Sequence, residues 1–371
     1  MPSRYAKWMY EWETRLTTRD TNRVVRPFDW GLEWTHDFPG VNGNYGSSSG
    51  DLETYFHKLN DHIVAHSDEF YSYLRPSDYR LEERKALRHG TGANALPDPE
   101  NPETAQFLRF TSPVKTPYPE NDTANARWFP AKKPNGCAMV LLPQWNSDAF
   151  GHNALAQIFN RFGVSCLRMS KPYHDVRRPA EIERADYAVS ANIGRTLSAA
   201  RQGVIDVRCC LDWLESQGYK DFGILGTSLG SCYAFIASAH DRRLRVNAFN
   251  HASTYFADVV WTGQSTRHIR EGIEHEITLE SLRHAWLGIS PMAYFDKFAR
   301  WPKKSLIVYA KYDLTFLPEF SKQTVAEFKK WNLDAKVAIL PCGHYTTGET
   351  PYKYMDAWHL SKFVRNAFLS R

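Results

Sequence analysis

The chain has 371 residues, of which 43% are hydrophobic and 23% charged, the composition of an ordinary globular protein. Its 46 basic and 41 acidic residues are interspersed and give a net charge of +5, so no nucleic-acid-binding surface is expected. The longest apolar runs, such as AMVLL at 138–142, are far too short to span a bilayer, and we expect no membrane span.

The first residues and the cysteines bear on the compartment. The stretch MPSRYAKWMYEWETRL contains no apolar segment of the secretory kind. The six cysteines form no CxxC pair and most fall inside apolar segments, which favours buried free thiols in a reducing compartment. These features predict a cytoplasmic protein.

The N-terminal part of the chain, residues 1–105, is rich in aromatic side chains. Residues 1–50 are irregular and end in the turn-rich VNGNYGSSSG, and residues 90–104 predict a loop. Between them, apolar residues at helical spacing predict a helix within 51–75, with Asp51 as its N-cap. We expect residues 1–105 to pack on the body as an extension, which either caps a pocket, forms a dimer contact or covers the back of a sheet.

From residue 106 onward, short apolar segments alternate with helical ones. Strands are predicted at 106–114, 126–131, 137–143, 163–169, 221–226, 245–251, 305–310 and 335–341. The first two form a hairpin or meander, and CAMVLLP at 137–143 is typical of a strand buried on both faces. The alternation predicts an α/β domain with a mostly parallel sheet covered by helices on both faces. Residues 252–300 interrupt it with amphipathic segments and no clear strand.

Gly226-Thr227-Ser228-Leu229-Gly230 lies between a predicted strand and a predicted helix. A strand, a tight turn and a helix are the context in which a GxSxG serine is a nucleophile. The flanking glycines leave room for a strained turn that exposes the serine hydroxyl. The alternative is a Gly-rich phosphate-binding loop, but no GxGxxG or GK[ST] pattern follows. We therefore predict Ser228 as a nucleophile at a helix N-terminus.

A serine nucleophile needs a base and an acid that orients it. Asp313 follows the strand at 305–310, and His344 follows the strand at 335–341. Catalytic groups gather beyond the carboxyl ends of parallel strands, and the order Ser, acid, His suits this architecture. Taken alone, Asp313 is equally a turn or cap residue, and His344 a surface loop residue. Together with Ser228 they predict a catalytic triad.

With these residues placed, the chain from 106 to 371 resembles an α/β-hydrolase. The GTSLG segment at 226–230 is similar to the nucleophile elbow, Asp313 to the acid, and GHY at 343–345 to the histidine loop. The segment KPYHDVRRP at 171–179 is similar to stretches in esterase, dienelactone-hydrolase-like and uncharacterised branches of this superfamily. The resemblance implies a serine hydrolase that needs no metal or organic cofactor. It does not extend to residues 1–105.

One departure concerns the oxyanion hole, the pair of N–H donors that hold the substrate oxygen. Many members of the superfamily carry His-Gly after the strand that corresponds to CAMVLLP, but here the sequence continues as Pro143-Gln144-Trp145. The resemblance implies the backbone N–H of Leu229 as one donor. We expect Gln144, or else Trp145, to supply the second.

The insertion at 252–300 stands where this fold commonly carries a lid. We predict Tyr255 and Trp261 of the insertion, with Trp145, as substrate-binding residues in an apolar acyl pocket. The alternative is that the insertion's rings only pack the lid on the core; they are Tyr255, Phe256, Trp261, Trp286, Tyr294 and Phe295. Near the same edge, four basic residues either meet an anionic substrate or form a solvated loop or structural ion pairs; they are Lys171, His174, Arg177 and Arg178.

The sequence thus predicts an α/β-hydrolase fold with a helical lid and an N-terminal extension. The expected function is hydrolysis of a small-molecule carboxylic ester through an acyl-enzyme on Ser228. Two alternatives remain open: acyl transfer by the same residues, and a non-catalytic protein of this fold that binds a ligand.

Overall fold

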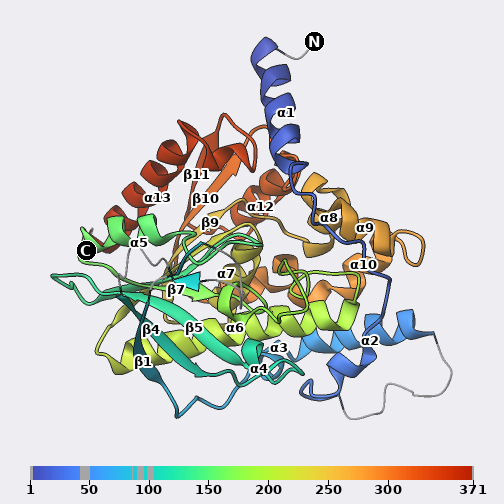
Figure 1. Ribbon diagram of the computed structural model, residues 1–371, viewed down its shortest axis with the longest axis horizontal. Helices are drawn as coiled ribbons and strands as arrows, with labels where there is room; N and C mark the ends of the chain where they lie inside the picture. The colour runs from blue at the N-terminus through green and yellow to red at the C-terminus, as the bar shows by residue number, and fades with distance from the viewer. Residues whose placement is uncertain (1–2, 42–50, 86, 90–95, 98–103, 370–371) are drawn as a thin grey trace.

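The computed structural model describes residues 3–41, 51–85, 87–89, 96–97 and 104–369 (Figure 1). Its centre is a nine-stranded sheet with the strand order β1-β4-β5-β7-β6-β8-β9-β10-β11. The strands are β1 (Arg80–Lys85), β4 (Thr104–Thr111), β5 (Thr123–Phe129), β6 (Cys137–Leu142), β7 (Ser165–Ser170), β8 (Asp221–Thr227), β9 (Leu244–Asn250), β10 (Lys304–Ala310) and β11 (Ala335–Leu340). A separate pair is formed by β2 (Leu87–His89) and β3 (Leu96–Pro97).

The sheet is antiparallel at one edge and parallel through the rest. β1 pairs with β4, β4 with β5 and β5 with β7 in antiparallel register. From β7 across to β11 every neighbouring pair is parallel. Strand β6 is buried along its whole length, as its unbroken apolar sequence predicted. The predicted α/β fold with a mostly parallel sheet is confirmed.

Helices cover both faces of the sheet and form two hydrophobic cores. One core receives α6 (Ile193–Ser216), α7 (Leu229–His240) and α12 (Pro318–Lys330). The other receives α1 (Arg4–Thr17), α5 (Asn153–Asn160) and α13 (Tyr352–Leu369). The other described helices outside residues 252–300 are α2 (Leu52–Ala65), α3 (Ser67–Phe70), α4 (Pro119–Asp122), η1 (Leu32–Thr35), η3 (Asp175–Arg177) and η7 (Thr346–Gly348).

The insertion at 252–300 is a set of short helices fixed to the first core. They are α8 (Phe256–Thr262), η4 (Gln264–Thr266), α9 (Arg267–Ile273), α10 (Leu279–Ala285), η5 (Leu287–Ile289), η6 (Pro291–Tyr294) and α11 (Phe295–Phe298). Trp286 and Phe298 are fully buried, and the Phe298 ring stacks on Phe235 of α7 at 4.6 Å. The α10 helix lies against α2, so the N-terminal segment helps to hold the insertion in place.

The start of the chain differs from the prediction of an irregular segment, because residues Arg4–Thr17 form the helix α1. Ser3 caps it by accepting a hydrogen bond from the Ala6 N–H at 3.1 Å. Its buried face is made of Ala6, Met9, Glu13 and Thr17, so two polar residues interrupt the apolar periodicity that would reveal a helix. In Figure 1, α1 stands out from the body at the top.

Residues 80–85, which belong to the predicted extension, form β1 and pair with β4. The loop predicted at 90–104 lies almost wholly outside the described residues. In the described part of the chain, no helix has the length and apolar character needed to cross a membrane.

Candidate active site

Ser228 occupies the sharp turn between β8 and α7. Its φ of 58° and ψ of −121° place it in a strained region for a residue with a side chain. A Cβ atom at Gly226 would overlap the carbonyl oxygen of Gly230, and one at Gly230 would overlap that of Leu142. Both glycines of GTSLG are therefore required by close backbone contacts, as the sequence argument expected.

The three residues of the predicted triad meet at the carboxyl edge of the sheet. The Ser228 Oγ lies 3.1 Å from Nε2 of His344, and Nδ1 of His344 lies 2.9 Å from Oδ2 of Asp313. Both distances are those of hydrogen bonds, which is the geometry that a base and its orienting acid require.

Asp313 is buried and accepts four hydrogen bonds. Its Oδ1 receives the backbone N–H groups of Thr315 at 2.8 Å and Phe316 at 2.7 Å. Its Oδ2 receives Nδ1 of His344 and Nδ1 of His251. Burial alone would raise the pKa of Asp313, but the two histidines and their hydrogen bonds hold it well below its usual range. The carboxylate is therefore charged at any pH near neutrality.

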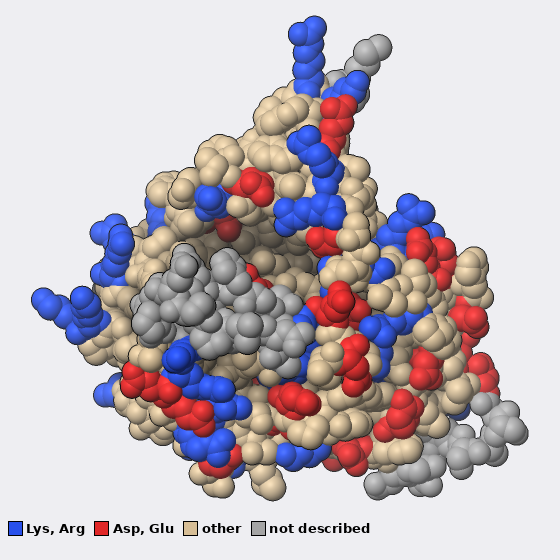
Figure 2. Space-filling view, in the orientation of Figure 1, with Lys and Arg blue, Asp and Glu red and all other residues tan. Residues whose placement is uncertain are grey.

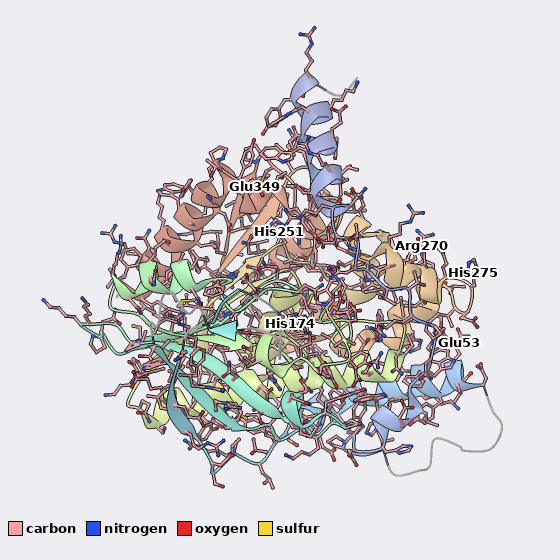
Figure 3. The ribbon with its side chains drawn as sticks, in the orientation of Figure 1. Glu53, His174, His251, Arg270, His275 and Glu349 are labelled. Carbon is pink, nitrogen blue, oxygen red and sulfur yellow. The ribbon has the colours of Figure 1, made fainter. Side chains whose placement is uncertain are left out.

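His251 is a site residue that the sequence did not single out. It follows β9 directly with a φ of 56°, and its Nδ1 lies 3.0 Å from Oδ2 of Asp313 (Figure 3). Burial and the neighbouring His344 lower the pKa of His251. A neutral imidazole with Nδ1–H donates to the carboxylate, so His251 holds the same oxygen of Asp313 that His344 contacts. The only signal in the sequence was its place at the end of a predicted strand.

His344 contacts Ser228 directly. Burial lowers its pKa, but the charge of Asp313, the hydrogen bond to it and the charge of Glu13 outweigh burial and raise the pKa above 6.5. The Phe316 ring stacks on the imidazole at 5.3 Å and restricts its rotation. The imidazole therefore loses its proton, and becomes able to accept one, as the pH rises through this raised pKa.

Among the described residues, one group of side chains is close enough together to hold a metal ion: His251, Asp313 and His344, whose ligand atoms lie within 4.8 Å of one another. The two imidazole Nδ1 atoms stand 2.9 and 3.0 Å from the same carboxylate oxygen. In a tetrahedral zinc site with bonds of about 2.0–2.2 Å, neighbouring ligand atoms stand about 3.3–3.6 Å apart, so the shorter N···O distances here are those of hydrogen bonds. The group is therefore arranged for proton sharing.

Residues 143–146, here called the Gln144 loop, follow β6 and lie against the start of α7. The ammonium of Lys171, which is 1% exposed, donates to the carbonyl oxygens of Pro143 at 2.7 Å and Gln144 at 3.0 Å. In a trans peptide the N–H points opposite to the C=O, so the N–H groups of Gln144 and Trp145 point away from Lys171. Within the described chain, the N–H groups of Gln144 and Leu229 donate to no other group.

Trp145 is fixed at the rim of the site by its indole. Its Nε1 donates to the Ala185 carbonyl at 2.9 Å, and its ring stacks on His268 at 5.8 Å. The Arg184 guanidinium lies over the same ring at 5.6 Å. These contacts hold the side chain rigidly where it lines the cavity beside Ser228.

A cavity of about 1160 Å³ opens onto Ser228 and His344. In Figure 2 the surface is hollowed below α1, where Figure 3 places Glu349 and His251, which both line the cavity. Its apolar wall is formed by Val189, Leu229, Cys232, Phe256, Val259 and Val260. Two polar pairs also line it: His152 with Thr227 at 2.8 Å, and Asn250 with Asp356 at 3.0 Å. Burial raises the pKa of Asp356 to about 7.

Of the three predicted substrate-binding residues, the structure places only Trp145 at the cavity. Tyr255 lines a separate surface pocket beside Arg283, and the Trp261 ring packs under Arg270, which lies well apart from His251 in Figure 3. Phe256, Val259 and Val260 occupy one face of α8 at helical spacing and turn inward instead.

The four basic residues at 171–178 lie in the interior and do not line the cavity; they are Lys171, His174, Arg177 and Arg178. Arg177 forms an ion pair with Asp206 at 2.8 Å in which both side chains are fully buried. The Nδ1 of His174 is paired with the Pro172 carbonyl at 2.8 Å. This segment therefore forms structural ion pairs and hydrogen bonds, as one of the alternatives predicted, and it is not a solvated loop. The six cysteines are buried and form no disulfide within the described residues, as predicted.

Comparison with solved structures identifies the architecture. The acetyl xylan esterase 1 of Thermoanaerobacterium sp. JW/SL YS485 matches with a TM-score of 0.55 and 14% identity, over 92% of this chain and 100% of the esterase. The acetyl xylan esterase of Paenibacillus sp. R4 matches at 0.53 and 13%, over 83% and 93% of the two chains. The chain has the α/β-hydrolase fold.

The acylaminoacyl peptidase of Pyrococcus horikoshii matches the same fold at a TM-score of 0.54 and 12% identity, over 78% of this chain and 48% of the peptidase. No family model matches the sequence, and no curated protein matches it either. Within this fold, Ser228 occupies the turn between β8 and α7, and Asp313 and His344 follow the last two strands of the sheet.

Proposed function

We propose that this protein is a serine hydrolase that cleaves carboxylic esters through an acyl-enzyme on Ser228. The observation that carries the proposal is the unbroken hydrogen-bond chain from Ser228 Oγ through His344 to Asp313, with distances of 3.1 and 2.9 Å, at the mouth of a cavity. A serine hydroxyl becomes a useful nucleophile only when a positioned base takes its proton.

The reaction follows from these positions. His344 takes the proton of Ser228 as its Oγ attacks the acyl carbonyl, and Asp313 stabilises the imidazolium that forms. Collapse of the tetrahedral intermediate breaks the ester C–O bond, and His344 returns the proton to the leaving alcohol. A water molecule then gives a proton to His344 as it attacks the acyl-enzyme. Collapse of the second tetrahedral intermediate breaks the bond between the acyl carbon and Oγ, His344 returns the proton to Oγ, and the acid leaves.

The negative oxygen of each tetrahedral intermediate needs preorganised donors. The N–H of Leu229, at the start of α7, is one, and the N–H of Gln144 is the other. Both are open in the described chain, and the dipole of the 12-residue helix α7 favours negative charge at this point. In many proteins of this fold a glycine follows the strand that corresponds to β6. In this chain the loop at that place is held by the hydrogen bonds from Lys171.

The cavity supports a small-molecule ester with an apolar acyl group. Its apolar wall is made by α8 and the start of α7, and Trp145 closes one side. The matched structures of the same fold are named as acetyl xylan esterases and an acylaminoacyl peptidase, which favours acyl-group chemistry at this site.

Hydrolysis of p-nitrophenyl esters with graded acyl lengths tests the proposal. We expect turnover by the wild type and a loss of about 10⁴-fold or more in kcat for Ser228→Ala, with Ser216→Ala as an exposed control that keeps full activity. A fluorophosphonate should label Ser228 in the wild type. Equal rates for wild type and Ser228→Ala would refute Ser228 as the nucleophile, and absence of both turnover and labelling would favour a non-catalytic protein of this fold.

A further inference from the structure

A carboxylate from the N-terminal helix lies buried beneath the loop that carries His344. Glu13 of α1 has no exposed surface. Its Oε1 accepts the Tyr345 N–H at 2.8 Å, and its Oε2 accepts the Thr346 N–H at 2.9 Å and the Thr346 hydroxyl at 3.0 Å. Burying an ionisable carboxylate costs desolvation free energy. The packing of α1 does not require this residue to be charged, so the carboxylate is explained by its three hydrogen bonds to the loop.

Residues 343–347, here called the His344 loop, are shaped around this carboxylate. The Gly343 N–H donates to the Thr346 hydroxyl oxygen at 2.6 Å, which links the start of the loop to the group that contacts Glu13. A Cβ atom at Gly343 would overlap the Glu13 carboxylate, although the φ of Gly343 lies outside the left-handed region. The glycine therefore makes room for Glu13 and is not needed for the backbone conformation.

This arrangement fixes His344 from both sides along the chain. Its neighbours Gly343 and Tyr345 are tied to Glu13, directly or through Thr346, while its ring must reach both Ser228 and Asp313. A displacement of about 1 Å at a reacting group can cost about 100-fold in rate. Loss of the carboxylate would free the loop at the residues next to the base.

The charge of Glu13 also acts on the site. Three titratable groups face it: Asp313, whose charge disfavours that of Glu13, His344, whose charge favours it, and Cys342, whose pKa burial and the charge of Glu13 help to raise. Burial raises the pKa of Glu13, while the two N–H bonds from the loop lower it. In return, the negative charge of Glu13 adds to that of Asp313 in raising the pKa of His344.

We infer that Glu13 is a positioning residue of the proposed hydrolase, and that α1 completes the active site by holding the His344 loop. The inference rests on the proposed function for its catalytic consequence. It gives the N-terminal segment a role that neither its sequence nor the fold comparison indicates.

Glu13→Gln and Glu13→Ala test the inference, with Glu11→Gln on the exposed side of α1 as a matched control. We expect kcat to fall by about 10- to 100-fold in both Glu13 variants while KM stays within about twofold, because the base is misplaced and the pocket is not. Loss of a negative charge lowers the pKa of His344, so the acidic limb of the kcat/KM profile should move to lower pH. Glu11→Gln should change neither quantity.

A second experiment uses the space that Glu13 occupies. Gly343→Ala places a methyl group against the carboxylate and should cost as much activity as Glu13→Ala. In the Glu13→Ala background the methyl group has room, so Gly343→Ala should add less than about threefold. Fully additive losses would overturn the inference. If Glu13→Gln does not fold, Thr346→Val replaces it as the test, because it removes only the bridging hydroxyl. This variant should also lower kcat, but by less than the Glu13 variants.

Amide hydrogen exchange separates this inference from the proposed function. Glu13→Gln should speed exchange at Tyr345 and Thr346 whether or not the protein cleaves esters. If the wild type is inactive but this exchange changes, the proposed function fails and the loop-holding role stands. If the wild type is active and Glu13→Gln leaves kcat, the pH profile and the exchange unchanged, the inference fails and the proposed function stands.

Discussion

The His344 loop and the Gln144 loop each follow a parallel strand and are each fixed by a buried charged side chain, but the two charges have opposite signs. Glu13 accepts hydrogen bonds from N–H groups of the His344 loop. Lys171 donates hydrogen bonds to C=O groups of the Gln144 loop. The charge at each loop thus matches the backbone group that it holds: a carboxylate accepts from N–H groups, and an amino group donates to C=O groups.

The two contacts also differ in their response to pH. Burial lowers the pKa of Lys171 well below its usual value, but a neutral amine still has two N–H bonds for its two carbonyl partners. A protonated Glu13 would instead present an O–H to N–H donors. We therefore expect low pH to release the His344 loop while the Gln144 loop stays in place.

Lys171→Met breaks the contact at the Gln144 loop and should have the largest effect. Two buried carbonyl groups lose their hydrogen-bond donors, which costs about 1–3 kcal/mol of stability for each. We therefore expect the loop to change its conformation so that these carbonyl groups reach other donors. Because the Gln144 N–H then leaves the oxyanion position, kcat for ester hydrolysis should fall by about 100-fold or more.

The control for this variant is Lys133→Met, which alters an exposed lysine. The pH of the acidic limb should stay unchanged in Lys171→Met, because His344 and its partners are untouched. A Lys171→Met protein with normal kcat would mean that the Gln144 loop needs no ammonium to hold its conformation.

His251→Phe should have an intermediate effect, because His251 holds the acid and neither loop. Asp313 keeps three of its four hydrogen bonds, so we expect a loss of about 10-fold in kcat and of about 1 kcal/mol in the free energy of unfolding at pH 7.

The pH dependence of this loss has a definite sign. The lowered pKa of Asp313 contributes stability above its unfolded value of about 3.9, and that stability disappears as the pH falls. The buried neutral His251 adds a cost below its unfolded pKa of about 6.5. Urea unfolding should therefore show a stability difference between wild type and His251→Phe that is largest near pH 7 and shrinks towards pH 3. A constant difference would contradict the proton-sharing arrangement.

Tyr10→Ala should have the smallest effect, because it only weakens the docking of α1 on the body of the protein. The Tyr10 ring meets Tyr312 edge-on at 5.4 Å, and such a pair is worth about 0.5–1.5 kcal/mol. Weaker docking of α1 should lower kcat by less than about threefold and lower the thermal midpoint by a few degrees. An equal loss in the Lys171→Met background would show that the two loops are held independently.

The catalytic candidates were accessible from the sequence because each of them follows a strand whose apolar run is unmistakable. The order of the strands and the carboxyl-edge rule then bring Ser228, Asp313 and His344 to one place. The helices and strands after residue 106 were found for the same reason, since apolar periodicity is strong in elements that build a core.

The supporting residues could not be found in this way. Glu13 and Lys171 are charged residues in the interior, and a sequence pattern assigns such residues to the surface unless their partners are known. Their partners are backbone groups of distant loops, which no side-chain pattern reveals. Tyr255 and Trp261 lie away from the cavity for a different reason: the face that α8 turns inward depends on where that helix begins, at Phe256.

The bond between Glu13 and Tyr345 joins residues 332 positions apart. The ribosome therefore finishes α1 long before the segment that it must hold exists. A helix of this length is marginal in water without a surface to pack on, and closing so long a loop is entropically costly. Activity should consequently emerge only after the rest of the chain has folded and α1 has docked, so that an incomplete chain carrying Ser228 remains unreactive.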